Sequence, residues 1–195
     1  DGSGAGVLGA HSRFARTLLF SDDGQYLFSS GADGRIKVWD METRALFRDI
    51  ELDQGYAHSL DLNRSQEKLL VGRMNGTMEI WDWRRRLVHR KLPGESYGTM
   101  RAVFDESAGR IISAHTSGAV KLWRGEDTML LLDLVGFSDG QWLSFTPDGY
   151  YDCSAFGDRY VRWRNGQQLY PLERYADIYK RPSVIEDVLQ GGYTP

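Results

Sequence analysis

Three side chains near the start of the chain are of the types that perform nucleophilic catalysis. His11, Ser29 and Asp33 could form a hydrolase triad, in which the imidazole takes the serine proton and the carboxylate orients the ring. That chemistry also needs a sharply turned nucleophile loop and an oxyanion hole, and the sequence around Ser29 contains neither motif. The pattern therefore favours a structural role for these residues.

The other groups that could perform chemistry are isolated from suitable partners. Cys153 lies in a predicted strand and lacks the Cys-Gly type of loop and the separate histidine that a caspase-like nucleophile needs. The four histidines have no metal-ligand spacing, and the acidic turn at 21–24 lacks the residue order of a calcium loop. We therefore predict no catalytic residue, no metal site and no cofactor.

The densest basic run lies at residues 84–86 and 89–91, directly after a Trp-Asp-Trp sequence. It falls in a predicted turn between two strands. Two interpretations are open, a solvated turn or a docking patch for an acidic partner.

The composition excludes several classes of protein. The 195 residues carry a formal net charge of -3, whereas nucleic-acid-binding domains usually carry a basic excess. No apolar run approaches the roughly 20 residues needed to span a bilayer. The single cysteine excludes an internal disulfide and fits a reducing compartment. We expect a cytoplasmic protein that binds neither nucleic acid nor membrane.

The chain repeats itself with a period near 42 residues. Four tryptophans, Trp39, Trp81, Trp123 and Trp163, are spaced by 42, 42 and 40 residues, and each follows a turn signal such as Asp-Gly or Asn-Gly. A second turn lies upstream, so each unit is predicted to contain four strands. Their ranges are 16–20, 26–31, 35–40 and 46–50; 57–62, 68–72, 77–82 and 87–91; 99–104, 110–115, 119–124 and 129–134; and 142–146, 150–154, 160–164 and 168–172.

With Gly9-Ala10-His11 and the segment SSGADGRIKVWD at 29–40, the chain resembles the WD-repeat family. The resemblance implies an all-β fold, a β-propeller of four-stranded antiparallel blades. We expect about four blades in residues 11–172, a linker or the end of a preceding blade in residues 1–10, and a short helical extension in residues 173–195. The fourth unit departs from the pattern, with Arg162 at a usually apolar place, and is interpreted as an atypical terminal blade.

The resemblance also assigns roles to individual side chains. His11, Ser29, Asp33 and Trp39 match the structural hydrogen-bond network inside a WD-repeat blade, which the other three units lack. By analogy of fold, partners bind at the end of the blades formed by the loops before the first strand and between the second and third strands. The candidate partner-binding residues there are Arg13, Arg16, Tyr56, Arg73, Tyr97, Arg101 and His115.

The C-terminal segment predicts two short helices. Tyr175, Ile178 and Tyr179 have helical spacing, Ser183 with Glu186 suggests a capping box, and a Gly-Gly pair at 191–192 would end the second helix. The stretch from 146 onward also resembles one that follows propellers in large bacterial proteins, some of which carry a caspase-like peptidase domain.

We therefore expect a non-catalytic scaffold that binds a protein or peptide, as a regulatory or recruitment module of a larger bacterial multidomain protein. The alternative is a sensor or gating segment of a peptidase, or of another enzyme, whose catalytic domain lies outside this chain. About four blades form only a partial ring, and its open faces and edges need a cover. Another chain, a second copy or the rest of the parent protein would complete the propeller.

Overall fold

The computed structural model describes residues 8–65, 67–93 and 97–193, and most of them lie in antiparallel strands. The chain divides into two compact units, which are described separately. The first contains Asp1–Glu106 and His115–Ser117, and the second contains Ser107–Ala114 and Gly118–Pro195. The expected linker falls largely in residues 1–7, outside the described residues.

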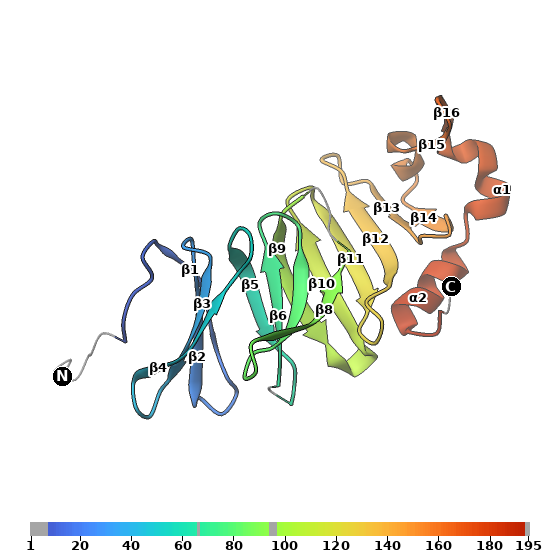
Figure 1. Cartoon of the computed structure of the whole chain (residues 1–195). Coiled ribbons are helices and arrows are strands. Elements are labelled where there is room, and N and C mark those ends of the chain that lie inside the picture. The colour runs from blue at the N-terminus through green and yellow to red at the C-terminus, as the bar shows by residue number, and fades with distance from the viewer. Residues whose placement is uncertain (1–7, 66, 94–96, 194–195) are drawn as a thin grey trace. The chain divides into compact units, whose positions relative to one another are not determined.

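The first blade is a four-stranded antiparallel sheet, drawn in blue in Figure 1. Its strands β1 (Ala15–Phe20), β2 (Tyr26–Gly31), β3 (Arg35–Asp40) and β4 (Ala45–Glu51) are neighbours in chain order. Gly34, with φ of 77°, occupies the position of the β2–β3 turn that needs a left-handed backbone. The turn residues explain why the predicted strand limits lie within one residue of the observed limits.

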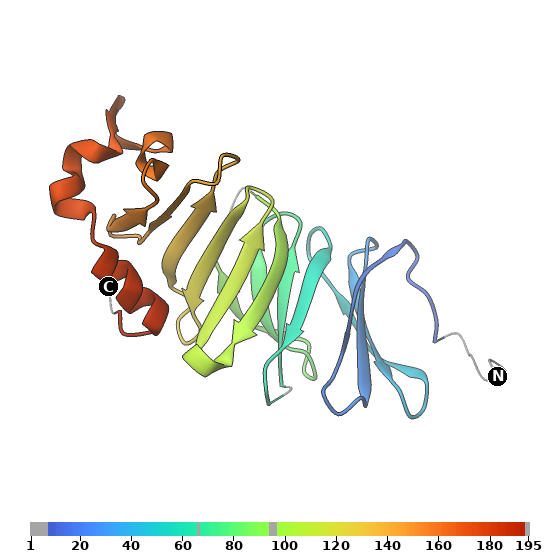
Figure 2. The same cartoon turned by 180° about the vertical axis from the view of Figure 1, so that it is seen from behind.

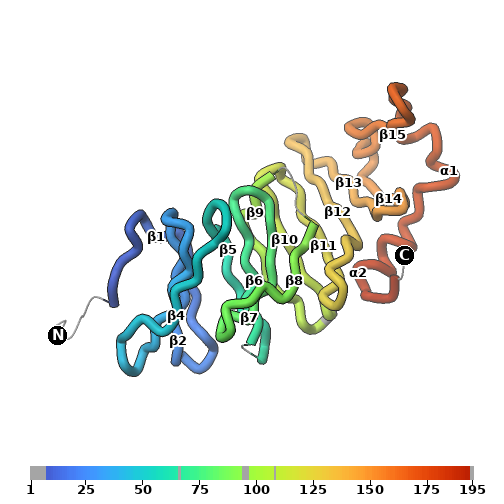
Figure 3. The backbone as a smooth tube through the Cα atoms, in the orientation of Figure 1, coloured from blue at the N-terminus to red at the C-terminus, as the bar shows by residue number. Residues whose placement is uncertain are grey.

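The second blade repeats this arrangement with β5 (Ala57–Leu62), β6 (Lys68–Arg73), β7 (Met78–Asp82) and β8 (Leu87–Leu92). The first unit also contains β9 (Thr99–Asp105), which runs beside β5 in the backbone trace of Figure 3. Ser59 joins the two strands, because its Oγ lies 2.9 Å from the backbone nitrogen of Ala102 and 3.1 Å from the carbonyl oxygen.

The core of the first unit lies between its two blades. Strand residues alternate between the two faces, so Ile36 and Val38 lie on the face opposite Trp39. That face packs against Leu60, Val71 and other residues of the second blade. The cluster comprises Phe28, Ile36, Val38, Ile50, Leu52, Ala57, Leu60, Leu69, Val71, Trp81 and Trp83. Burial of each large side chain contributes about 1.5–3 kcal/mol, so stacking is what stabilises the blades.

The second unit begins with the 3₁₀ turn η1 (Glu106–Ala108), most of which lies in it, and continues with β10 (Arg110–His115), β11 (Ala119–Arg124) and β12 (Leu130–Gly136). The next strands, β13 (Trp142–Phe145) and β14 (Tyr151–Cys153), extend the same sheet beyond β12, as Figure 2 shows from behind. The fold class is confirmed, with four-stranded antiparallel blades in a mostly β chain.

The fourth repeat is not a separate four-stranded blade, and this expectation is corrected. Its first two strands pair with β12, while β15 (Arg162–Asn165) and β16 (Gln168–Pro171) form their own two-stranded sheet. The expected strand start at Tyr160 is instead the end of a 3₁₀ turn, η2 (Gly157–Tyr160). Gly157 packs so closely on the carbonyl of Trp142 that a Cβ there would lie 2.1 Å from the oxygen. At this point the chain forms η2 in place of the hairpin that the repeat pattern predicts.

The C-terminal helices are η3 (Leu172–Tyr175), α1 (Ala176–Tyr179) and α2 (Pro182–Gln190). The expected capping box is wrong, because α2 begins two residues earlier than a Ser183 N-cap requires, with Arg181 as its N-cap residue and Ser183 inside the first turn. Proline is favoured at the first helical position, since its missing N–H would be unpaired there in any case. Gly191, with φ of 90°, ends the helix as expected.

Candidate protein-binding surface

The four residues of the expected blade network form one chain of hydrogen bonds. His11 Nδ1 lies 3.0 Å from Asp33 Oδ1, and His11 Nε2 lies 2.9 Å from Ser29 Oγ. Trp39 Nε1 donates to the same serine oxygen over 2.9 Å. Nδ1 donates its N–H to the carboxylate, so Nε2 accepts from the serine hydroxyl. Ser29 is 4% exposed, and its hydroxyl is therefore engaged in hydrogen bonds within the blade.

The Gly-Ala-His segment fits closely over the tryptophan. Gly9 has a φ of 133°, and a Cβ on it would lie 2.7 Å from Trp39 Cη2. Only glycine combines that backbone conformation with that close approach to the ring. The segment therefore positions His11 for its bonds to Asp33 and Ser29.

We predict that the network contributes less to the free energy of unfolding at acid pH. Burial alone would raise the pKa of Asp33, but bonds from the Ser12 backbone and from His11 hold it below its ordinary value of 3.8. A carboxyl group with a lowered folded-state pKa contributes stability above pH 4 that is lost as the pH falls through the folded-state pKa. The stability gap between wild type and Asp33→Asn, measured by urea unfolding, should therefore narrow below pH 4. A gap that stays constant down to pH 2 would contradict this.

In the second blade, the ring N–H of the repeat tryptophan has a different hydrogen-bond acceptor, which was not predicted from the sequence. Val71 stands 42 residues after Ser29 and offers no hydroxyl group. Trp81 Nε1 instead donates to Glu79 Oε2 over 3.0 Å, and the buried carboxylate also binds Arg73. The sequence contains two signals of this difference. A valine stands at the serine position, and a glutamate stands where the neighbouring repeats carry Lys37 and Lys121.

Arg73 was expected to contact a partner, and the structure corrects this. Its side chain is only 2% exposed and is paired with both Glu79 and Asp53. His115, also expected at the binding face, is 5% exposed. Both side chains are enclosed within the fold and present no surface to a partner.

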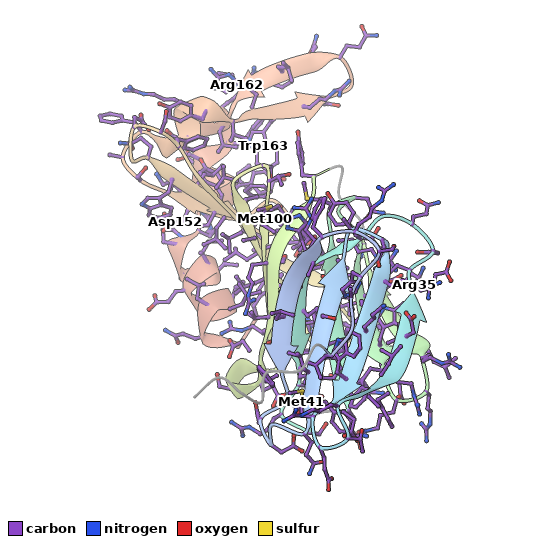
Figure 4. All side chains as sticks on the ribbon, turned by 90° about the vertical axis from the view of Figure 1, so that its left-hand side faces the viewer. Arg35, Met41, Met100, Asp152, Arg162 and Trp163 are labelled. Carbon is purple, nitrogen blue, oxygen red and sulfur yellow. The ribbon has the colours of Figure 1, made fainter. Side chains whose placement is uncertain are left out.

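The repeat tryptophans of the second unit behave differently from each other. Trp123 Nε1 donates to Ser113 Oγ over 2.8 Å, which reproduces the Trp39–Ser29 bond of the first blade. Trp163, labelled in Figure 4, comes from β15. The centroid of its ring lies 5.0 Å from that of the Tyr179 ring. Its buried Nε1 has no hydrogen-bond partner among the described residues. Trp163 is thus not a blade tryptophan, since the fourth repeat pairs its strands differently.

Two of the expected partner-binding residues meet on the surface of the first unit. The guanidinium of Arg16 lies 4.4 Å from the centroid of the Phe14 ring and 4.8 Å from that of Tyr56. Arg16 Nη2 also donates to the Tyr56 hydroxyl over 3.3 Å, and the rings of Tyr56 and His58 are 5.6 Å apart. Phe14 is 62% exposed. An arginine held between two aromatic rings is therefore presented to solvent.

A repeated backbone bond positions these groups. The amide of Ala32 donates to the carbonyl of Phe14 over 3.0 Å, and Met74 bonds Tyr56 over 3.4 Å in the same way one repeat later. Thr116 and Gly98 form the third such bond, over 2.9 Å. The exposed and partly exposed residues around these positions form what we call the rim surface. They are Arg13, Phe14, Arg16, Tyr56, His58, Tyr97 and Met100, of which Met100 is labelled in Figure 4.

The rim surface carries positive charge mainly on its arginines. Burial lowers the pKa of His58, and the charge of Arg16 lowers it further, so both effects disfavour a positive charge on the ring. Arg101, another expected contact residue, is exposed in β9. Burial raises the pKa of the nearby Asp61, although the Phe104 amide and Arg101 act in the opposite direction.

The remaining candidate groups are Cys153 and the possible metal-ligating side chains. Cys153 is buried as a free thiol in β14. Within the described residues, no group of three or more His, Cys, Asp or Glu side chains is placed to hold a metal ion. No helix in the described part of the chain is long and apolar enough to cross a bilayer.

Comparison with known proteins finds one family model that matches the N-terminal part of the chain. Residues 3–40 match the model of the WD domain, G-beta repeat, a range that includes the whole His11–Trp39 network. A 37-residue segment is 46% identical to the U3 small nucleolar RNA-associated protein 18 homolog of Arabidopsis thaliana. That match covers 18% of this chain and 7% of the plant protein.

The solved structures that resemble the chain agree on the fold. The WD40 repeats of RRP9 superpose with a TM-score of 0.62 and U3-55K with 0.61, each at 16% identity over 75% of this chain. The chain spans about half of those two proteins, 49% and 50%. The computationally designed Ika4 protein has a TM-score of 0.58 at 25% identity, and the match covers 75% of this chain and 94% of Ika4.

Proposed function

The chain carries a WD repeat and folds into the blades of WD40 propellers, and from this premise we propose that it is a non-catalytic scaffold that binds a protein or peptide partner. The observation that carries the proposal is the Arg16 guanidinium held between Phe14 and Tyr56 on the rim surface. Arginine and tyrosine are enriched among residues that dominate interface energies. Their contacts with each other reduce the side-chain entropy lost on binding.

The non-catalytic part of the proposal is supported by the state of the triad-like residues. Ser29 is buried, and its hydroxyl is already bonded to His11 and Trp39. A nucleophile must reach the reacting carbon of its substrate, and this serine is enclosed in the blade.

We propose a polypeptide rather than a nucleic acid as the partner. The plant relative is an RNA-associated protein by name, so RNA is the alternative that a test must include. Nucleic-acid binding depends on many phosphate contacts, and the net charge of -3 supplies no general attraction for phosphates. The exposed apolar groups Phe14, Tyr97 and Met100 instead suit a partner with apolar side chains.

The test is selection of peptides that bind the chain from a random display library, followed by affinity measurements on substituted proteins. We predict that Arg16→Ala and Tyr56→Ala each weaken peptide binding at least about tenfold, since truncating a central contact costs about 1.4 kcal/mol or more. The matched control is Arg85→Ala, which removes an exposed arginine from the basic turn. That control should bind like the wild type.

Two results would sink the proposal. In the first, the selected peptides bind Arg16→Ala as tightly as wild type but no longer bind Arg85→Ala. The binding site would then be the basic turn and not the rim surface. A single-stranded RNA oligonucleotide that binds more tightly than any peptide and needs Arg16 would make RNA the ligand.

We propose in addition that a further blade, from another chain or another part of a parent protein, packs on the first blade. Leu18 and Phe20 are 63% and 56% exposed on one face of this blade. Leu60, which stands 42 residues after Leu18, is only 1% exposed because the first blade covers it. Membership of a larger bacterial multidomain protein of the cytoplasm stays part of this proposal.

A further inference from the structure

The helix α2 packs on the sheet of the second unit. Ile185 and Val188 are 4% and 1% exposed and contact Leu122, Leu131 and Leu132. Figures 1 and 2 show the helix lying beside the strands β12 and β14. The apolar stripe of a short helix therefore covers one face of a blade sheet.

The repeat identifies which face this is. Leu122 stands 84 residues after Val38, and Leu134 stands 84 residues after Ile50. Both pairs hold the same register, because Val120 pairs with Leu134 as Ile36 pairs with Ile50. In the first unit, Val38 and Ile50 belong to the cluster that receives the second blade. The helix thus covers the face that corresponds to the one with which the first blade binds the second blade.

The sequence under the helix is adapted to this contact. Leu132 occupies the position at which the first and second blades carry Arg48 and Arg90, both partly exposed. In the second unit this position is fully buried. An arginine there would place a charge beneath Ile185 and Val188, whereas leucine completes the apolar contact.

Both ends of α2 are fastened to the sheet. Arg110 Nη1 donates to the carbonyls of Val188 and Leu189 over 3.0 and 2.8 Å, at the end of the helix where backbone acceptors lack partners. Before the helix, the amide of Arg181 donates to the carbonyl of Tyr151 over 2.9 Å. After it, the Tyr193 hydroxyl donates to Asp148. The helix is therefore held at three points as well as by its apolar face.

We infer that α2 is an end cap. It covers the face on which a following blade would pack, and so prevents copies of this chain from joining end to end. The counterpart surface is the exposed face of the first blade, with Leu18 and Phe20. Once α2 leaves, the face with Leu122 and Leu132 can bind that surface of a second copy, as the first blade binds the second. Contacts between unlike surfaces do not close on themselves in pairs, so uncapped copies would form chains or rings. Repeat arrays generally need such caps to stay soluble.

The test is the mass of the full chain by analytical ultracentrifugation over a range of concentrations. We expect Ile185→Asp/Val188→Asp to release the helix and to raise the average mass at least twofold over wild type at high concentration. Adding Leu18→Asp should return the mass to the wild-type value. Leu189→Asp, an equal charge on the exposed side of the same helix, is the matched control and should leave the mass unchanged.

Hydrogen exchange of residues 182–190 reports whether the helix has left the sheet, and exchange of β10–β12 reports whether the sheet stays folded. Arg110→Gln, which keeps the apolar contact but loses the two carbonyl bonds, provides a milder release if the double variant unfolds. Fast helix exchange with an unchanged mass in either folded variant would overturn the inference. Association that persists in the presence of Leu18→Asp would overturn it as well.

Discussion

Replacement of Glu79 by leucine is expected to lower the free energy of unfolding by about 3–5 kcal/mol, the usual cost of removing one partner of a buried ion pair. Among the residues that the structure describes, the substitution leaves the Arg73 side chain, which is 2% exposed, with Asp53 as its one anionic partner. It also removes the acceptor of the Trp81 ring N–H and one partner of Lys91. Urea unfolding of the two proteins measures the difference.

The double variant Arg73→Met/Glu79→Leu separates the ion pair from simple packing. If the cost arises from a stranded charge, the double variant should be more stable than Glu79→Leu alone, because apolar residues of similar volume can replace a buried pair. Glu51→Leu is the control, because it breaks the more exposed pair with Arg35 and should cost less than about 1 kcal/mol. Equal losses in the single and double variants would mean that Glu79 acts through Trp81 and Lys91 and not through Arg73.

The regular part of the fold was predictable because turn chemistry and strand alternation are local properties. Gly34 and Gly76 have φ of 77° and 86°, and each ends a turn that the Asp-Gly or Asn-Gly sequence predicts. The His11–Trp39 network was identified through the family resemblance, because its members stand at fixed positions of one repeat. Its hydrogen bonds then follow from the side chains that the strands bring together.

The Glu79–Arg73 pair was not predictable in the same way. Arg73 lies at the end of β6, where the repeat pattern predicts an exposed loop. Its burial depends on Asp53 and Glu79, which come from a different loop and a different strand. No local pattern records that three such residues meet, so a charged side chain was expected at the surface.

The fourth repeat shows the opposite limit, where a local pattern is present but tertiary contacts override it. Its tryptophan stands 40 residues after that of the third unit, close to the repeat period of 42 residues. Val161 and Trp163, however, pack into a cluster with Leu143, Tyr151 and Leu172 instead of joining a blade. Burial of these side chains within the second unit outweighs the propensity for a further hairpin.

Replacement of Trp39 by alanine is expected to cost roughly 2–4 kcal/mol of unfolding free energy, because the indole is 5% exposed and its removal leaves a cavity. Loss of the Nε1 donor also leaves Ser29 with one bond fewer, to His11 alone. Trp142→Ala, at a tryptophan that is 44% exposed, serves as the control and should cost less. Both are measured by urea unfolding, with tryptophan-independent circular dichroism as the signal.

Because Trp39 also packs against Gly9, the loss should be accompanied by faster amide exchange around His11. Equal costs at Trp39 and Trp142, or unchanged exchange at His11, would show that the network does not fasten this segment to the blade.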